Sequence, residues 1–300
     1  MTNLTARLPA QRRMKQRGAG RVKKWALIGP AFLYYSIFFW APALLLLTYV
    51  FLTPGRFGGV TWEFSLASFQ KLADPLWVGI LSNSVYLALG ATLVALVLGV
   101  PAAYAISRIP NQRWKIVALV LVVIPFWTSF LIRLYAWLFL LNTQGPLNGF
   151  LVDSGILAEP LEWLYTEPLV IIVMAYTYLP LMILPVYAAL EKIDSDIVEV
   201  AADLGAGPIT RLWRVVVPIA LPGMVTGSIL IFVPSLGNFL VPDLIGGGKY
   251  PMVGSVIRDQ FLLAKDWPFA SLLVMILVVF LVALFSLQSW LARRTAGEFK

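Results

Sequence analysis

Long apolar stretches, separated by short segments that carry nearly all of the charge, set the pattern of this chain. A transmembrane helix needs about 20 consecutive apolar residues, and six stretches reach that length. We expect transmembrane helices at residues 25–52, 75–107, 116–141, 169–190, 215–241 and 269–292. Only the third stretch contains a charged residue, Arg133. The pattern therefore predicts an all-α membrane protein with six transmembrane helices.

The distribution of basic residues predicts the orientation of these helices. Residues 1–24 hold eight Lys and Arg and no acid, so we expect a basic cytoplasmic tail. With both termini cytoplasmic, the inside segments hold 17 of the 23 Lys and Arg and the outside segments hold five, as the positive-inside rule requires. The alternative is a signal peptide. It is disfavoured because the apolar run at 25–52 is too long and no small-residue cleavage site follows it.

The segment at 191–214 is polar and still has the periodicity of a helix. One apolar face has members spaced at i, i+3, i+4 and i+7: Ile197, Val200, Ala201 and Leu204. Asp196 suits an N-cap position and Glu199 follows three residues later, as in a capping box. Gly205 supplies a helix stop. A second short helix can begin at Pro208, since proline suits the first helical position.

The polar side of this short helix has two readings. Glu199 and Asp203 are four residues apart and lie opposite the apolar face, with the small Ala202 between them. Charge pattern alone allows a solvated polar face. It equally allows a docking surface for a partner that carries basic groups.

Composition excludes several function classes. The chain is 60% hydrophobic and 13% charged, whereas soluble domains are about 25% charged. With no Cys and no His, thiol catalysis, disulfides, zinc sites and imidazole chemistry are excluded, and a membrane enzyme is disfavoured. The glycines before Lys249 lack the spacing of a phosphate-binding loop, so we expect no ATP site and no metal or other cofactor in this chain. The basic excess is a topology signal, and we expect no nucleic-acid partner.

Arg133 is the most distinctive residue within a predicted span. Charged residues there usually face the bundle interior or a water-filled cavity. On a straight helix starting at residue 116, Arg133 would lie about 26 Å along the axis, close to the outer interface. Its side chain could snorkel to that interface or pair with an acid from another segment. We favour a structural or gating role.

Candidate pathway residues lie near the outer ends of two predicted spans. The first group surrounds Arg133, although aromatic residues are also common at membrane interfaces. The second group lies among prolines and glycines, where irregular backbone can line a cavity. The two groups are Trp127, Thr128, Ser129 and Tyr135, and Ser235, Asn238 and Asp243. The outside segments carry nine acids against five bases. That excess favours cations, although the positive-inside bias alone also depletes outside bases.

The polar segment resembles the EAA loop of bacterial ABC-importer permeases. The family's pattern is matched by the stretch from Glu199 to Gly205, followed after nine residues by Val215-Val-Val-Pro218. Valines stand at three of the pattern's apolar positions. The resemblance implies an ABC type I importer permease fold with a core at residues 75–292 and a coupling loop at 191–214. It also implies that the coupling helix inserts into a cytoplasmic ATPase subunit, which binds ATP and Mg. The implied coupling residues are Glu199, Ala201, Ala202, Asp203 and Gly205.

Further stretches are similar to spermidine/putrescine-type permeases. They are Pro125-Phe-Trp-Thr-Ser-Phe-Leu-Ile-Arg133-Leu-Tyr-Ala-Trp137, Asn142-Thr-Gln-Gly-Pro-Leu-Asn148, Pro242-Asp-Leu-Ile-Gly-Gly247 and Lys265-Asp-Trp-Pro-Phe269. This likeness implies an inner-membrane subunit that pairs with a second homologous permease and two ATPase subunits. A periplasmic solute-binding protein would deliver a polyamine.

Other functions stay open at this stage. The same architecture could carry another small solute, such as an opine, an amino acid or a thiamine-like cation. A stand-alone secondary carrier or channel is a further alternative. It is disfavoured because the spans contain no acid and the halves show no internal repeat.

Overall fold

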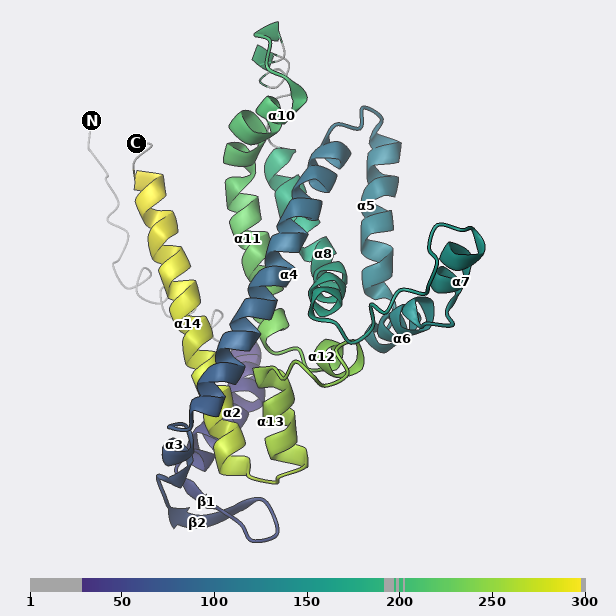
Figure 1. The fold of residues 1–300 in the computed structure, drawn as a ribbon. Coiled ribbons are helices and arrows are strands. Elements are labelled where there is room, and N and C mark those ends of the chain that lie inside the picture. The colour runs from purple at the N-terminus through teal and green to yellow at the C-terminus, as the bar shows by residue number, and fades with distance from the viewer. Residues whose placement is uncertain (1–28, 192–196, 198–199, 202, 298–300) are drawn as a thin grey trace, which may run out of the picture.

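The protein is mostly helical (Figure 1). The computed structural model describes residues 29–191, 197, 200–201 and 203–297. In the first half, the elements are η1 (Ser36–Trp40), α2 (Ala41–Tyr49), β1 (Leu52–Pro54), β2 (Val60–Phe64), α3 (Ala67–Lys71), α4 (Pro75–Ser107), α5 (Gln112–Trp127) and α6 (Phe130–Leu141). In the second half, they are α7 (Pro146–Asp153), α8 (Glu167–Leu190), α10 (Pro208–Arg211), η2 (Leu212–Val216), α11 (Val217–Leu236), α12 (Leu240–Leu244), α13 (Val253–Leu262) and α14 (Trp267–Gly297).

Three long helices, α4, α8 and α11, pack against one another and form the centre of the molecule. Their close approach depends on small residues. A Cβ added at Gly223 of α11 would lie 2.5 Å from the carbonyl oxygen of Pro185 in α8. One added at Gly227 would lie 2.8 Å from the Met182 sulfur. Small residues serve helix contacts in membranes in this way because lipid provides no hydrophobic drive for association.

The number of apolar helices agrees with a membrane protein. Five described helices are long and apolar enough to span a membrane: Gly29–Tyr49, Pro75–Ser107, Glu167–Leu190, Pro208–Leu236 and Trp267–Ser286. A sixth results if the bent pair Gln112–Trp127 and Phe130–Asp153 counts as one span. The helix expected within the uncharged run 75–107 is found, and it occupies the whole of that run as α4. Asp74 caps it by accepting a hydrogen bond from the backbone N–H of Leu76, and Pro75 takes the first position.

The straight helix expected at 116–141 is wrong. The chain forms α5 and α6 instead, with a bend of 91° between the two helical parts. Thr128 and Ser129 lie between them. Thr128 has extended backbone angles, and both its N–H and its hydroxyl donate to the carbonyl of Pro125. These hydrogen bonds close α5 at Trp127. The depth of about 26 Å expected for Arg133 therefore fails, because it assumed one straight axis.

The bounds of the other expected spans also need correction. The described part of the first helix ends at Tyr49, and the polar segment after it holds the antiparallel hairpin β1–β2 and α3. The span expected at 215–241 starts earlier, at Pro208, and ends earlier, at Leu236. It ends there because the Asn238 side chain accepts from the N–H of Val241 and starts a new short helix, α12. The last helix, α14, begins two residues before the expected 269.

The two ends of the molecule differ in composition. In Figure 1, α10 lies at one end, together with the C-terminal end of α4 and the start of α5, and the hairpin β1–β2 lies at the other. The α10 end carries the bases expected inside: Arg108, Arg113, Lys115, Arg211 and Arg214. The described part of the polar segment, residues 191, 197, 200–201 and 203–214, thus lies at the basic end of the helix bundle.

Candidate functional site

The first candidate site is the tip segment, which comprises residues 197, 200–201 and 203–211 and projects beyond the bundle at the α10 end (Figure 1). Its apolar face is uncovered. Leu204 is 83% exposed, Val200 55% and Ile197 49%. An apolar helical face that the chain itself leaves open has the composition of a docking surface.

The end of the short helix in the tip segment follows the sequence-based expectation. Gly205 has a positive φ of 84°, which residues with a Cβ rarely adopt. The N–H of Ala206 then donates to the carbonyl of Ala201 at 3.0 Å, the longer bond of a Schellman motif. Pro208 opens α10 as expected. The glycine thereby sets the direction in which the chain leaves the helix and enters α10.

The five implied coupling residues are only partly placed by the structure. Ala201, Asp203 and Gly205 belong to the tip segment, where Asp203 is exposed. Glu199 and Ala202, together with the expected N-cap Asp196, lie outside the described residues. The role of all five in binding a partner stays a prediction.

The second candidate site lies at the bend between α5 and α6, where Arg133 reaches α8. Its Nη1 donates to the carbonyl of Thr177 at 3.5 Å, and its guanidinium lies 5.8 and 5.9 Å from the rings of Phe130 and Phe126. Its Nε is buried and has no hydrogen-bond partner. Within the described ranges no carboxylate is paired with Arg133, so the expected ion pair with an acid is not found there.

The next residue of α8 completes this site. The Asn238 side chain donates to the hydroxyl of Tyr178 at 3.0 Å, across 60 residues of sequence. Arg133, Thr177, Tyr178 and Asn238 thus join three segments, and we name these four residues the bend cluster. Sequence reasoning missed Thr177 and Tyr178, because they sit inside an uncharged run. The available signal was two adjacent polar side chains shortly before Pro180.

Two hydroxyls beside these contacts are buried and unsatisfied. Thr177 is 2% exposed and Ser235 is fully buried, and neither hydroxyl has a hydrogen-bond partner among the described residues. Buried polar groups are almost always hydrogen-bonded. The Thr177 hydroxyl in α8 and the Ser235 hydroxyl in α11 are thus free to bond a further polar group. Thr177 is also the residue whose carbonyl accepts from Arg133.

Asp243 lies apart from the bend cluster and is already paired. Its carboxylate forms an ion pair with Arg258 of α13 and accepts from the hydroxyl of Ser255 at 3.2 Å. Arg258 also pairs with Asp259. The hydrogen bond to Asp243 raises the pKa of Arg258 above its usual value. Sequence reasoning did not single out Arg258, which ties α12 to α13.

The other candidate pathway residues are not gathered into one site. Trp127, Thr128, Ser129 and Tyr135 are exposed at the bend, with Trp127 at 83%. Among the described residues, no group of three acids could hold a metal ion. Pathway roles for these residues stay predictions.

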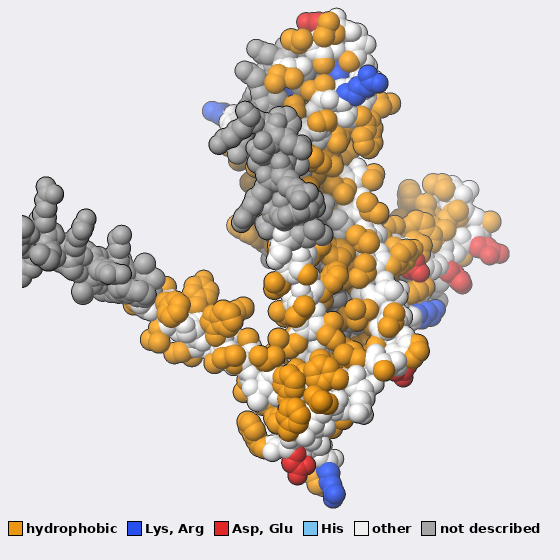
Figure 2. Space-filling view, turned by 90° about the vertical axis from the view of Figure 1, so that its left-hand side faces the viewer, with side chains coloured by type: hydrophobic (Ala, Val, Ile, Leu, Met, Phe, Trp, Pro, Cys, Tyr) orange, Lys and Arg blue, Asp and Glu red, His pale blue; other side chains and the backbone are white. Residues whose placement is uncertain are grey.

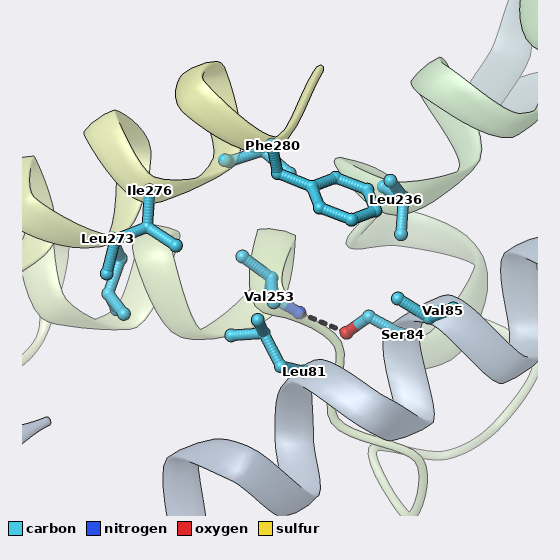
Figure 3. Close-up of a pocket in the computed structure, with 9 residues that line it drawn as sticks. Leu81, Ser84, Val85, Leu236, Val253, Leu273, Ile276 and Phe280 are labelled. Carbon is cyan, nitrogen blue, oxygen red and sulfur yellow. Dashed lines mark hydrogen bonds between the residues drawn. The ribbon is translucent and has the colours of Figure 1, made fainter. Parts of the chain in front are cut away.

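An apolar cavity between four helices does not suit a charged solute (Figure 3). It measures about 30 Å³ and is lined by residues of α4, α11, α13 and α14. Its one polar side chain, Ser84, accepts a hydrogen bond from the N–H of Val253 at 2.8 Å. This cavity is a packing seam between helices.

Comparisons with known proteins bear on the family and the fold of the chain. The family model described as "Binding-protein-dependent transport system inner membrane component" matches residues 95–297. The "Spermidine/putrescine transport system permease protein PotB" of Haemophilus influenzae is 40% identical over 230 residues, 77% of this chain and 80% of the relative. PotB of Escherichia coli K12 is 37% identical over 262 residues, 87% of this chain and 94% of the relative.

A solved structure resembles the fold as a whole. It is the crystal structure of a bacterial alginate ABC transporter in complex with an alginate pentasaccharide-bound periplasmic protein. The match has a TM-score of 0.74 and covers 94% of this chain and 98% of the other, at 16% identity. At that identity the likeness concerns the fold alone.

Proposed function

The chain belongs to the family of binding-protein-dependent transport system inner membrane components, and we propose that it translocates polyamine-like cations as a permease subunit of an ABC importer. The observation that carries the choice of solute is the identity of 37–40% to two PotB permeases. Both are named for spermidine and putrescine. The excess of acids over bases in the outside segments is compatible with a cationic solute.

The energy for this transport comes from outside the chain. As an ABC permease subunit in the inner membrane it is a transport component and not itself an ATPase. ABC importer permeases work with ATPase subunits and a periplasmic binding protein. We assign the tip segment to contact with the ATPase, because it is exposed, apolar and located at the basic end of the bundle. Closure of the ATPase dimer would then move α10 and, through it, the continuous helix that leads to Leu236.

The bend cluster is the part of the proposed pathway that such movement can reach. The helix Pro208–Leu236 connects the tip segment directly to Asn238. The Asn238 side chain donates a hydrogen bond to the hydroxyl of Tyr178. The carbonyl of the neighbouring Thr177 accepts the hydrogen bond from Arg133. We propose that this chain of contacts positions Arg133 as a positive barrier in the cation pathway. The exposed residues Trp127, Thr128, Ser129 and Tyr135 would lie at its outer side.

The chain supplies half of the proposed pore. We infer that a second homologous permease, two cytoplasmic ATPase subunits and a periplasmic solute-binding protein complete the importer, with both termini of this chain in the cytoplasm. The unburied surface of the first helix, Gly29–Tyr49, leaves room for lipid or a second permease.

Uptake of labelled solutes tests this proposal. Cells that express the chain with the genes encoded beside it should accumulate labelled putrescine or spermidine, and vesicles depleted of ATP should not. Accumulation of an amino acid, an opine or thiamine instead would keep the importer and refute the polyamine. Uptake driven by a proton gradient without ATP would refute the importer and favour a secondary carrier.

A further inference from the structure

A cluster of exposed aromatic rings follows directly after the first apolar helix. Phe51 lies two residues beyond the end of α2, and its ring lies 6.1 Å from that of Phe64 and 5.8 Å from that of Phe69. Trp62 and Phe57, on the same hairpin β1–β2, are 79% and 96% exposed. Rings that are this exposed stabilise nothing within the chain.

The length of the first helix limits how far this hairpin can lie from the membrane. Gly29–Tyr49 has 21 residues and is about 31 Å long, close to the hydrocarbon thickness of about 30 Å. Lys23 and Lys24 stand shortly before it. A helix of this length that starts near one headgroup layer reaches the other at about Tyr49, and any tilt places its end deeper.

A second helix indicates the same level. Trp267 is the first residue of the apolar span Trp267–Ser286, and its ring lies 6.1 Å from that of Tyr49. Below them, Val50 packs in one buried cluster with Phe269, Leu272 and Leu273. Two spans thus end together, and the hairpin is attached at that point.

The hairpin has an aromatic and a polar face. Alternate residues of a strand point to the same face, so Trp62 and Phe64 share one face of β2, and Thr61 and Glu63 share the other. Tryptophan and other aromatic rings concentrate at the headgroup level of membranes. Arg56 lies at the turn and is exposed, where it can meet lipid phosphate.

We propose that the aromatic face of hairpin β1–β2 lies in the headgroup layer of the membrane, at the end opposite the tip segment. This aromatic face is continuous with the first helix, Gly29–Tyr49, and no residue of that helix is buried within the chain (Figure 2). This helix packs mainly against α14 and leaves the body of the molecule as an arm. The hairpin fixes the depth of that arm. The assignment of this headgroup layer to the outer leaflet rests on the proposed function, in which both termini are cytoplasmic.

Depth measurement with spin labels tests this proposal, and the chain is suited to it because it has no Cys. Trp62→Cys and Phe64→Cys report on the aromatic face, and Glu63→Cys is the matched control on the same strand. Phe57→Cys removes a ring that is almost fully exposed, so it keeps the test valid if the strand variants fold poorly. The full chain, purified with the subunits that accompany it, is labelled with a nitroxide in nanodiscs of phosphatidylethanolamine and phosphatidylglycerol.

Power saturation then compares collisions with oxygen, which enters lipid, and with nickel-EDDA, which stays in water. We expect labels at 57, 62 and 64 to favour oxygen and the label at 63 to favour nickel-EDDA, a difference of several-fold in the ratio. Equal nickel-EDDA collisions at 62, 63 and 64 would overturn the proposal. The proposal would also be overturned if the labels at 62 and 64 were protected from nickel-EDDA only after the binding protein is added, because the aromatic face would then dock a protein. Neither result depends on which solute is transported.

Discussion

At the scale of single residues, Arg133 holds a charge that no carboxylate within the described residues balances. Its guanidinium lies 5.8 and 5.9 Å from the rings of Phe130 and Phe126, and its Nε is buried without a hydrogen-bond partner. An unpaired charge of this kind is costly. Sequence reasoning could single it out as the one charge within a span, but not its partners, since these depend on a bend that places α6 against α8.

Replacing Arg133 by Met keeps an unbranched apolar side chain, about as long as the aliphatic stem of arginine, and removes the guanidinium and its charge. We expect the free energy of unfolding to stay within about 1 kcal/mol of the original value, because the loss of the contacts between the guanidinium and the rings is offset by removal of a buried charge without a carboxylate partner. Leakage of putrescine through ATP-depleted vesicles should rise about tenfold, because a positive barrier worth at least 1.4 kcal/mol is lost. Arg133→Lys, which retains the charge, is the control. Unchanged leakage in the Met variant would rule out the barrier.

Asn238 offers a test of the bend cluster by stability. Asn238→Ala removes the acceptor for the N–H of Val241 and the donor to Tyr178. Leaving buried groups unpaired should cost about 2 kcal/mol, measured by thermal unfolding in detergent. Asn238→Asp keeps the acceptor for Val241 and should cost less. Equal losses in the two variants would show that the cap of α12 contributes nothing.

At the scale of helices, small residues decide how closely α11 and α8 pack. Gly223→Ala would place a Cβ 2.5 Å from the carbonyl oxygen of Pro185 and 2.8 Å from the Cα of Val186. Because both neighbours are backbone atoms, we expect a loss of about 2 kcal/mol. Gly79→Ala in α4 meets nothing within 4 Å and should be neutral or stabilising by up to about 1 kcal/mol. A Gly223→Ala protein as stable as the Gly79→Ala protein would contradict this packing.

The element scale also shows what sequence could and could not predict. The uncharged run at 75–107 predicted a helix, and α4 fills the whole run. Asp74 and Pro75, which mark the start of α4 as N-cap and first helical residue, were overlooked as a signal. The bend after Trp127 was missed, since Thr128 and Ser129 interrupt the run without changing its apolar character. The hairpin at 52–64 was missed although apolar and polar residues alternate from Val60 to Phe64, which is a strand signal.

The helix stop in the tip segment can be tested with two neighbouring glycines. Gly205 has φ of 84° and Gly207 has φ of −66°, and a Cβ at either one would meet nothing within 4 Å. Gly205→Ala therefore strains the backbone by about 1 kcal/mol, whereas Gly207→Ala does not. We expect slower ATP-driven uptake with Gly205→Ala only. Equal rates in the two variants would show that the direction of the chain at Gly205 is unimportant for coupling.

At the scale of the whole molecule, the proposed function depends on a connection between the tip segment and the bend cluster. The helix from Pro208 to Leu236 runs between them, so we expect a movement of the tip segment to reach the bend cluster. A helical membrane protein with five or six spans could be predicted from the apolar runs, whereas the orientation of both termini stays a prediction. The contacts of the bend cluster could not be predicted, because they join residues 44 and 60 positions apart on different helices.

Co-purification with the ATPase tests the central claim most directly. The tagged chain is isolated in mild detergent, and all bound proteins are identified by mass spectrometry. Leu204→Asp places a charge on the apolar face of the tip segment. Leu262→Asp, on a residue 66% exposed in α13, is the control at the other end of the molecule. We expect an ATPase and a second permease with the original chain and with Leu262→Asp, and loss of the ATPase alone with Leu204→Asp. A chain that purifies without any ATPase, or a Leu204→Asp variant that keeps it, would contradict the assignment of the tip segment.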